Sequence, residues 1–497
     1  RLLFFGPAGT ASQTHRDANN NIKCMVVGCK YVRLFSPSQE KCLYPLQRGI
    51  LTNNSTLPTD ILTEPIDPEK LVGTDVVVVS KPDLIRQVLN ERPKTYIRPI
   101  NKNKIMPIPG MFNTEGEEWK RNRRLGAPAF NDNNSDAMVP DMSEVALKLV
   151  RQLRSLSQNG RIVWRPTEWL PLCTLDALCV TTFGHDFDFL NLDAERCAPG
   201  ADVVRQSGEV QQAMADALAG SGYAARLRRF PWMTRDRFPW NLNPMIRKMH
   251  TGVKRLNRMC DEIISSRRAE QQTAAEGRVE RRDLLDKLLH LNPEDLRGNL
   301  VTFLIAGSDT TAMTISWCLY YLSLNPHIQA KARAKVDALG HDLKTKADLN
   351  QLPYVECCIL ETLRLQPPGL LLLHECIADT SVEGHRIPCG TVVATLLHKA
   401  MVADSQGGTT FGPERWLTND GVSIDQSLVR DHLAFGGGPR QCPGQNMALK
   451  EATIILALIL RHFDEIKHNH SPSCVRGKAT FTYGPENLEL QMYQRFC

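Results

Sequence analysis

The sequence lacks several signatures that would assign it quickly to a class. It has no uninterrupted run of about 18 or more apolar residues, so no transmembrane helix is evident. It has no Lys/Arg-rich block of the kind that indicates nucleic-acid binding, and its formal net charge is only +6 over 497 residues, which argues against nucleic acid as a partner. No flavin or nicotinamide fingerprint follows a predicted strand. If the chain is a redox enzyme, its electrons therefore come from a partner.

Cysteine is frequent, but its spacing lacks the patterns of metal or disulfide scaffolds. The chain contains 15 cysteines, with no Cys-x-x-Cys pair and no Cys/His cluster of zinc-finger spacing. It is also too long, with cysteines too sparse, for a disulfide-stapled fold. We expect scattered reduced cysteines in a protein that faces the cytosol. An interaction protein stabilised by zinc or disulfides is an alternative that metal analysis would distinguish.

The first 64 residues differ in character from the rest of the chain. They show little periodicity and many Asn, Ser, Thr and Pro, which predicts a loosely structured leader. Their apolar start at residues 2–5 is compatible with the remnant of a membrane anchor. No linker interrupts residues 65–497, and no internal repeat occurs. We therefore expect a single domain over that range.

Helical patterns outweigh strand patterns in this body. Strands are predicted at residues 76–80 and 391–394. Helices are predicted at residues 82–90, 143–154, 171–183, 245–268, 326–339, 354–365 and 447–463. The segments 101–113, 230–244 and 271–280 are predicted to be loops or surface segments. The expected fold class is thus mainly α with small β-sheets.

One predicted helix is unusually long. Asn292 is a good capping residue, Pro293 suits the first turn, and the acidic residues after it match the helix dipole. The helical pattern continues to residue 324, where Asn325 and Pro326 end it. Such a helix is about 48 Å long and must cross the centre of the protein.

A glycine-rich loop places Cys442 before the last long helix. The segment from Phe435 to Gly444 contains Gly436, Gly438 and other residues that favour a tight turn. Arg440 and the following helix N-terminus would both favour a thiolate over a thiol. A thiolate on a rigid loop suits a metal ligand. A buried, inert cysteine beside a turn is the alternative.

The long helix contains a run of small and polar residues, Ala306-Gly307-Ser308-Asp309-Thr310-Thr311. Glycine in mid-helix is unfavourable, and threonine hydroxyls compete for backbone carbonyls, so we expect the helix to bend and open a groove. Asp309 and Thr310 place a carboxylate beside a hydroxyl, which is the minimum for relaying protons. The alternative is a close packing contact between helices.

A third motif is Glu361-Thr362-Leu363-Arg364, which puts a carboxylate and a guanidinium on one helical face. If buried, this pair needs further partners. Arg415, in Phe411-Gly412-Pro413-Glu414-Arg415-Trp416, is the candidate third member.

Taken together, these motifs resemble those of the cytochrome P450 family, in type and in order. The resemblance runs from Trp119 to Gly444. It implies the cytochrome P450 fold, with haem b between the long central helix and the helix after the Cys loop. Cys442 would be the iron ligand, Phe435 would shield the iron–sulfur bond, and Glu361, Arg364 and Arg415 would form a structural network. The implied cofactor-binding residues are Trp119, Arg123, Ala306, Gly307, His374, Phe435, Gly436, Gly438, Arg440, Cys442 and Gly444.

Four of these residues would bind the haem propionates. Trp119 and Arg123 lie four apart on a short predicted helix, and the resemblance gives them this role together with Arg440. An ordinary aromatic–cation surface pair is the alternative for the first two. His374 stands where the family usually has Arg, so a full charge there would depend on pH.

The resemblance implies a haem-thiolate monooxygenase that inserts one oxygen atom from O2 into a lipophilic organic substrate. Thiolate donation from Cys442 would favour O–O cleavage, and Asp309 and Thr310 would be the catalytic proton-delivery pair. NADPH would act indirectly, through a flavoprotein reductase or another electron donor. The predicted substrate pocket is lined by parts of 100–112, by Phe303 and Ala306, by 370–373 and by a turn near Tyr483. The basic residues Lys120, Arg121 and Arg124 form either a reductase-docking patch or a solvated face.

Two other functions stay open at this stage. A haem-thiolate isomerase, dehydratase or peroxygenase could dispense with the Asp309–Thr310 pair, and a non-enzymatic haem sensor would need neither that pair nor an apolar pocket. The resemblance to microsomal members implies a location at the endoplasmic reticulum membrane, on its cytoplasmic face, with possible membrane contact. A soluble cytoplasmic protein is the alternative.

Overall fold

The computed structural model describes residues 12–16, 23–27, 31–35, 75–99, 108, 110–191, 212–214, 216–217, 244–273, 283–403, 408–479 and 482–495. The chain forms two compact units. The sheet unit comprises Arg1–Ile100, Leu371–Ala400 and Gly437–Arg440, and the helical unit comprises Asn101–Leu370, Met401–Gly436 and Gln441–Cys497. The predicted surface segment at 230–244 lies outside the described residues up to residue 243, as do most of the predicted loops at 101–113 and 271–280.

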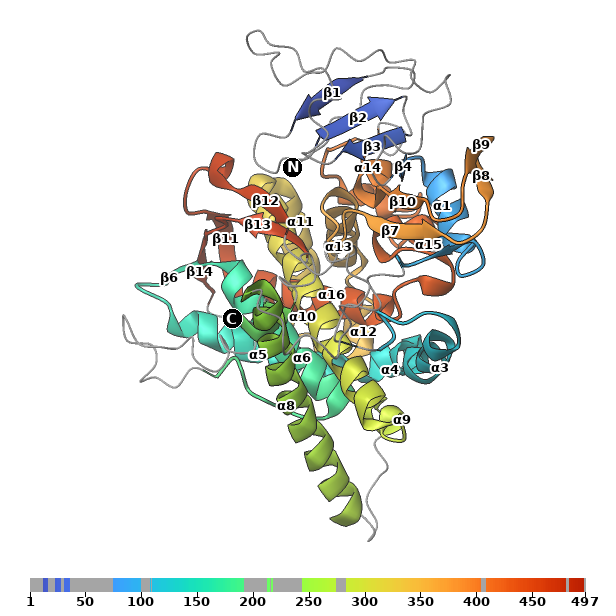
Figure 1. Ribbon diagram of the computed structural model, residues 1–497. Helices are drawn as coiled ribbons and strands as arrows, with labels where there is room; N and C mark the ends of the chain where they lie inside the picture. Colours follow the sequence, from blue (N-terminus) through green and yellow to red (C-terminus); the bar gives the residue numbers. More distant parts are fainter. Residues whose placement is uncertain are drawn as a thin grey trace. The chain divides into compact units, whose positions relative to one another are not determined.

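Helices dominate the described residues, as the sequence predicts (Figure 1). The α-helices are α1 (Pro82–Asn90), α3 (Gly116–Gly126), α4 (Asp132–Ala137), α5 (Val139–Ser155), α6 (Pro166–Phe183), α8 (Pro244–Thr273), α9 (Leu284–Leu288), α10 (Pro293–Leu324), α11 (Pro326–Asp337), α12 (Lys346–Leu349), α13 (Pro353–Leu365), α14 (Leu397–Met401), α15 (Gln426–Asp431) and α16 (Gln445–His462).

The strands are short. They are β1 (Ser12–Arg16), β2 (Lys23–Val27), β3 (Tyr31–Phe35), β4 (Asp75–Val79), β5 (Tyr96–Ile97), β6 (Arg161–Trp164), β7 (Leu372–Cys376), β8 (Thr380–Val382), β9 (His385–Ile387), β10 (Val392–Thr395), β11 (Phe463–His468), β12 (Arg476–Ala479), β13 (Tyr483–Glu486) and β14 (Leu490–Gln494).

The sheet unit is built on a seven-stranded sheet of order β1-β2-β3-β4-β10-β7-β5. Strands β4 and β10 pair in parallel, and β10 pairs antiparallel with β7, so that Val393 lies opposite His374. Strands β1, β2 and β3 fall within residues 1–64, where the sequence predicts a loosely structured leader. The β-branched and aromatic residues of β2 and β3 favour an extended backbone, and the pairing of β3 with β4 continues the sheet.

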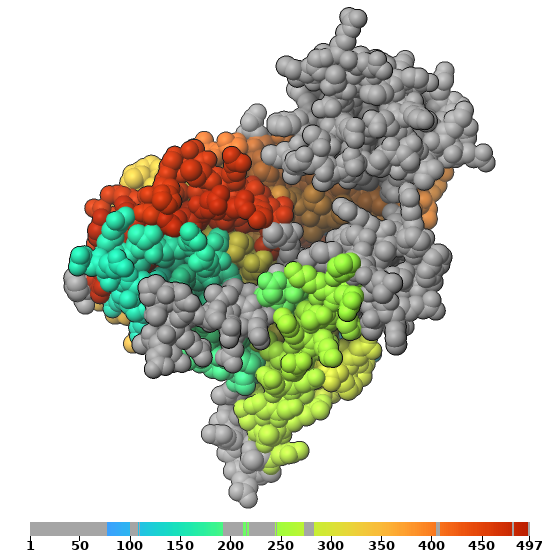
Figure 2. All heavy atoms as spheres, turned by 60° about the vertical axis from the view of Figure 1, so that its left-hand side comes forward, coloured from blue at the N-terminus to red at the C-terminus, as the bar shows by residue number. Residues whose placement is uncertain are grey.

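The helical unit surrounds α10, which packs against α6, α8, α13 and α16. Its N-terminus forms as predicted, because the Asn292 side chain accepts a hydrogen bond of 2.9 Å from the Asp295 N–H. A three-stranded sheet of order β11-β14-β6 lies in the same unit. In Figure 2 the red C-terminal strands lie beside the teal segment that contains β6, in agreement with the pairing of Leu490 with Trp164.

Helix α6 begins earlier than predicted. The sequence indicates a start at Pro171, whereas the helix starts at Pro166 and carries Pro171 in its interior. Either proline is compatible with the first turn of a helix, so the local pattern does not choose between them. The helix ends at Gly184, whose positive φ of 60° suits a glycine cap.

Candidate active site

The Cys loop connects a short 3₁₀ turn to α16. Within the helical unit, the Cys442 N–H donates a hydrogen bond of 2.9 Å to the carbonyl oxygen of Phe435, which closes the loop on itself. Gly436 has a φ of 73°, a conformation that glycine adopts without strain. The structure thus brings Phe435, Gly436 and Cys442 together in one tight turn, as the sequence predicts for a rigid ligand loop.

The middle of the loop belongs to the sheet unit, where it packs on the C-terminal end of α1. Gly438 has a φ of 63°, and a Cβ atom there would run into the carbonyl oxygen of Leu89. Gly437 also faces Leu89, at 3.3 Å from an added Cβ to the side chain. At Gly438 the approach to the Leu89 backbone is open only to glycine, whereas at Gly437 the Leu89 side chain would have to shift by a few tenths of an ångström. Packing therefore requires a glycine at position 438, in addition to the demands of the turn.

The Cys442 thiol is enclosed by the fold without being packed against it. Its side chain keeps accessible surface, yet burial raises the pKa of the thiol. The Gly444 N–H and the charge of Arg123 act in the opposite direction, toward the thiolate. Within the helical unit Arg123 is the cation that acts on the thiol, and burial outweighs its effect. The influence that the sequence assigns to Arg440 stays a prediction. A bound metal ion would reverse the balance, because thiolate ligands coordinate in the deprotonated form.

The other described cysteines differ from Cys442. Seven of the ten are buried, and burial raises the pKa of each of their thiols, which makes them inert. Cys389 and Cys474 are exposed, but neither lies on a glycine-rich loop that leads into a long helix. Among the described thiols, Cys442 therefore combines an enclosed position, an accessible sulfur and a nearby cation.

The polar run of α10 does not break the helix. Hydrogen bonding of the α type continues from Pro293 to Leu324, and the Thr310 hydroxyl donates to the Ala306 carbonyl oxygen at 2.8 Å. The α-helix thus continues through this run, and the expected bend and groove stay a prediction. Gly307 instead permits close packing, because a Cβ there would lie 3.0 Å from a methyl carbon of Leu178 on α6. Asp309 is half-buried, and burial raises the pKa of its carboxyl.

Glu361, Arg364 and Arg415 meet in the helical unit. The Glu361 carboxylate accepts hydrogen bonds from Arg364 Nε and Nη2, both at 2.9 Å, and from Arg415 Nε at 3.0 Å. The Trp416 indole N–H and the Gly412 N–H also donate to it, each at 3.0 Å. Because Glu361 is fully buried, these five donors replace the water that it loses on folding.

Arg364 in turn ties this network to the chain that precedes the Cys loop. Its guanidinium donates to the carbonyl oxygens of Met401, Gly408 and Thr410 at 3.1, 2.7 and 3.1 Å. The network thereby holds the backbone at Met401, Gly408 and Thr410 in place.

The predicted propionate ligands lie in both units. In the helical unit, Trp119 is buried and Arg123 is half-buried on α3. Burial lowers the pKa of Arg123, and the Cys442 thiol, which lies in the same unit, acts in the opposite direction. In the sheet unit, Arg440 is half-buried at the end of the Gly438–Arg440 turn. Whether these side chains bind propionates stays a prediction.

His374 is fully buried on β7, and its Nε2 shares a hydrogen bond of 3.2 Å with the Thr395 hydroxyl. Burial, together with the charges of Arg92 and Arg98, lowers its pKa to about 3. The imidazole is therefore neutral at physiological pH. Arg92 and Arg98 are cations that the sequence analysis missed, since neither forms part of a recognised motif.

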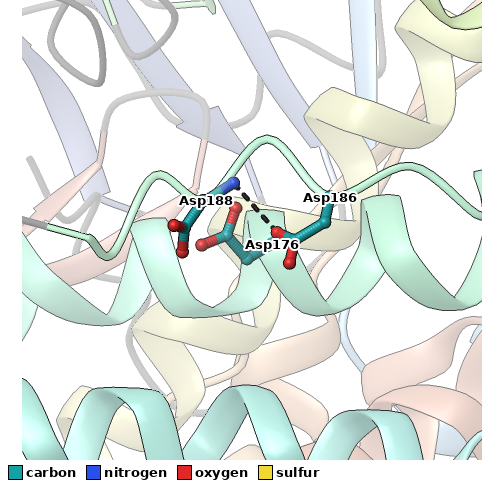
Figure 3. Close-up of side chains that lie close together, drawn as sticks. All are labelled: Asp176, Asp186 and Asp188. Carbon is teal, nitrogen blue, oxygen red and sulfur yellow. Dashed lines mark hydrogen bonds between the residues drawn. The ribbon is translucent and has the colours of Figure 1, made fainter.

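A group of acidic residues outside the Cys loop also resembles a metal site. Asp176, Asp186 and Asp188 bring their carboxylates together at the end of α6 (Figure 3). Their negative charge already has partners, because Lys148 Nζ lies 2.6 Å from Asp186 and 3.3 Å from Asp188, and Asp176 accepts the N–H groups of Phe189 and Leu190. These contacts explain the three carboxylates as a structural feature that holds the turn after α6 in place.

The proposed basic docking surface is electrostatically mixed. Lys120 pairs with Glu117 at 2.6 Å, and Arg121 forms an ion pair with Asp295. The surface hollow there is lined by Glu117, Glu118, Lys120, Arg121, Arg124, Glu294 and Asp295. With four acidic side chains among seven, this surface does not favour an acidic partner by charge alone.

His432 precedes the Cys loop and is buried with both ring nitrogens unpartnered among the described residues. Its ring lies edge-on to Trp416, with centroids 5.0 Å apart, and also contacts Phe435. Burial, followed by the charge of Arg364, lowers its pKa to about 3. The sequence gives no motif that would have singled this residue out.

We expect His432→Phe to make the protein more resistant to acid. Between pH 6.5 and about 3 the unfolded chain binds a proton that folded His432 does not, so stability falls as the pH falls. At pH 5 this cost is about 2 kcal/mol, and phenylalanine removes it. Urea unfolding from pH 7 to pH 4 measures the effect, with the exposed His327→Phe as a control. Equal pH dependence in parent and variant would contradict the expectation.

Comparison with known proteins decides the family. The family model for cytochrome P450 matches residues 63–492. The chain belongs to the cytochrome P450 family. It is 30% identical to rat cytochrome P450 4V2 over 380 residues (71% of this chain and 68% of the relative), and 27% identical to soybean chloroplastic cytochrome P450 97B2 over 443 residues (78% and 73%).

The solved structures agree with this assignment at the level of the fold. The crystal structure of a cytochrome P450, CYP102L1, superposes with a TM-score of 0.66 at 23% identity, covering 85% of this chain and 89% of that one. The predicted mainly α fold with small sheets is confirmed. A second model, for a cupin-like domain, matches residues 2–104 and overlaps the start of the P450 match; it covers too little of the chain to assign a function.

As a cytochrome P450, the chain is an oxidoreductase of the haem-thiolate monooxygenase class. The residues present fit a haem group. Cys442 offers an enclosed but accessible sulfur, and Arg123 offers a half-buried cation suited to a porphyrin carboxylate. Over the part of the chain that the structure describes, no helix combines the length and apolar character needed to cross a membrane.

Proposed function

We propose that this cytochrome P450 oxidises a lipophilic organic substrate with electrons from NADPH that arrive through a separate flavoprotein reductase. The observation that carries the proposal is the Cys442 loop, in which an accessible sulfur is enclosed beside Arg123 and the start of α16. When bound, haem b would supply the oxygen chemistry, which places one oxygen atom in the substrate and the other in water. The domain that performs it is proposed to span residues 65–497.

Each site residue has a proposed part. Cys442 holds the iron, and Phe435, Gly436, Gly438 and Gly444 shape the loop around it. Trp119, Arg123, His374 and Arg440 hold the propionates. Ala306 and Gly307 let α10 approach the haem face, Asp309 and Thr310 move protons, and Glu361, Arg364 and Arg415 brace the fold.

Apolar surface supports a lipophilic substrate. Leu371 and Leu373 of the sheet unit are 44% and 48% exposed, although most leucines among the described residues are buried. In the helical unit, Phe303 packs on Phe130 with ring centroids 5.3 Å apart. Pockets for small molecules are generally apolar with few polar groups, so these residues favour a lipophilic class without selecting one compound.

We also propose a location at the cytoplasmic face of the endoplasmic reticulum membrane. The resemblance to microsomal family members supports it, whereas the soybean relative is named as chloroplastic. Fractionation of cells that produce the full chain distinguishes this location from a soluble one.

The proposed function predicts that Thr310→Ala uncouples the reaction. In an assay with reductase, NADPH and ¹⁸O2 over a panel of lipophilic compounds, the parent is expected to yield singly ¹⁸O-labelled product. Without the Thr310 hydroxyl, product per NADPH should fall by roughly tenfold, because water replaces a positioned donor only in part. Thr311→Ala is the matched control, since Thr311 makes the same kind of bond, to the Gly307 carbonyl oxygen at 3.1 Å. Full coupling in Thr310→Ala would contradict the proton-delivery role of Thr310, whereas product that lacks ¹⁸O or forms without NADPH would favour the isomerase or peroxygenase alternative.

A further inference from the structure

The hairpin formed by β12 and β13 packs along one face of α10. Asp309, Met313 and Trp317 are spaced four apart and so share a face of the helix. Trp317 donates its indole N–H to the Tyr483 carbonyl oxygen at 3.2 Å, and the two rings stack with centroids 5.7 Å apart. At Gly484, an added Cβ would run into the sulfur of Met313. The start of β13 is thus held against α10 at two successive turns.

A second contact holds the start of β13 in place. The Tyr483 N–H donates to the Pro368 carbonyl oxygen at 2.9 Å, just after the end of α13. Because both the N–H and the C=O of Tyr483 are engaged, the residue before it has little freedom to move.

That preceding residue is Thr482, and its hydroxyl donates a hydrogen bond to the Asp309 carboxylate. Thr482 is only 4% exposed, so its hydroxyl is sequestered from bulk water. Burial raises the pKa of the Asp309 carboxyl, and the Thr482 hydroxyl acts against that rise. No charged side chain contributes to this shift among the described residues.

The charged and titratable groups on α6 and on β12 and β13 include Glu168, Asp176 and two buried cysteines on α6. On the strands they include Arg476, Tyr483 and the exposed Lys478–Glu486 pair. Because none of them sets the shift, the Asp309 proton responds mainly to burial and to Thr482.

We propose that Thr482 is a positioning residue for proton delivery: its hydroxyl holds the Asp309 carboxyl in one orientation beside Thr310. This rests on the proposed role of Asp309 and Thr310. The reason is chemical. A buried carboxyl with no partner would stay protonated and turn freely, whereas one that accepts a fixed donor keeps both its orientation and its ability to release a proton. Thr482 would therefore act through Asp309 and without touching the reacting atoms.

The test compares Thr482→Val with Thr482→Ser in the haem-loaded full chain. Valine keeps the branched shape and loses the donor, whereas serine keeps the donor. In Thr482→Val we expect product per NADPH to fall about five- to tenfold, the size of one lost hydrogen bond, and the pKa of Asp309 to rise. The pKa is read from the carboxylic C=O band by infrared titration, with the band assigned by its loss in Asp309→Asn. Thr482→Ser should behave as the parent.

A double variant separates this role from a merely structural one. In an Asp309→Asn background, adding Thr482→Val should cause no further loss of coupling. The proposal is overturned if Thr482→Val leaves both coupling and the infrared titration unchanged, or if its full effect persists in Asp309→Asn. If Asp309→Asn couples fully, Asp309 has no part in proton delivery and the positioning role falls with it. In that case the shift of the infrared band in Thr482→Val still reports the hydrogen bond between Thr482 and Asp309. Failure of the proton-delivery role is thereby distinguished from failure of the positioning contact.

Discussion

Cys442→Ser is expected to abolish the thiolate-type carbon monoxide difference spectrum of the reduced protein and to reduce O2-dependent product formation to background. A serine hydroxyl does not supply the strongly donating sulfur on which cleavage of the O–O bond depends. The fold should tolerate the change, since the backbone N–H that bonds the Phe435 carbonyl oxygen is retained. Absorbance spectra and product analysis measure both effects.

The matched control is Cys474→Ser, which makes the same substitution at an exposed thiol. It should keep the parent spectrum and turnover. A Cys442→Ser protein with an unchanged spectrum would contradict the assignment of the iron ligand. A parent protein that binds zinc and no iron would contradict the whole function.

Glu361→Gln should lower the free energy of unfolding by about 3–5 kcal/mol, as expected when one member of a buried ion pair is removed. The amide turns one acceptor oxygen into a donor. It thus faces at least one of the N–H groups that now point at the carboxylate, and it leaves Arg364 buried without its counter-charge. Because Arg364 also holds three carbonyl oxygens before the Cys loop, the fraction of protein that retains haem should fall with stability.

Glu144→Gln is a control of identical chemistry. Glu144 pairs with Arg151 at 3.0 Å on the surface, and both side chains are more than half exposed, so the pair contributes little. Urea unfolding and haem content are measured on both variants. The network would lose its proposed structural role if Glu361→Gln were as stable as Glu144→Gln.

Local sequence signals were sufficient to predict where the long helix α10 and helix α1 begin and end. Asn292, Pro293 and the Asn325-Pro326 pair mark the ends of α10, and the helix begins and ends where they indicate. Such caps act through the backbone groups of a single turn, so they can be recognised in the sequence without knowledge of the tertiary structure. At α6 the same type of signal was ambiguous, because two prolines compete for one start.

Charge and packing around the site depended on residues distant in the chain. Arg123 on α3, far from the Cys loop in the chain, supplies a charge that acts on the Cys442 thiol. Gly307 packs closely against Leu178 of α6, a contact that the helical pattern of α10 does not reveal. Thr482 reaches Asp309 because the hairpin is held by Trp317 and Pro368. Contacts of this kind arise only once the helices have packed.

The sequence by itself determined the chemistry of this protein: a cysteine on a glycine-rich loop, an acid–alcohol pair in a long helix, and a Glu-x-x-Arg pair with a distant arginine. These are covalent facts, and their order along the chain identifies the family. Only the tertiary structure decided how each group is tuned. It set the burial that raises the Cys442 and Asp309 pKa values and neutralises His374 and His432, and it paired the cations near Lys120 with acids. Solvation and electrostatic interaction depend on distances in space, which spacing along the chain does not specify.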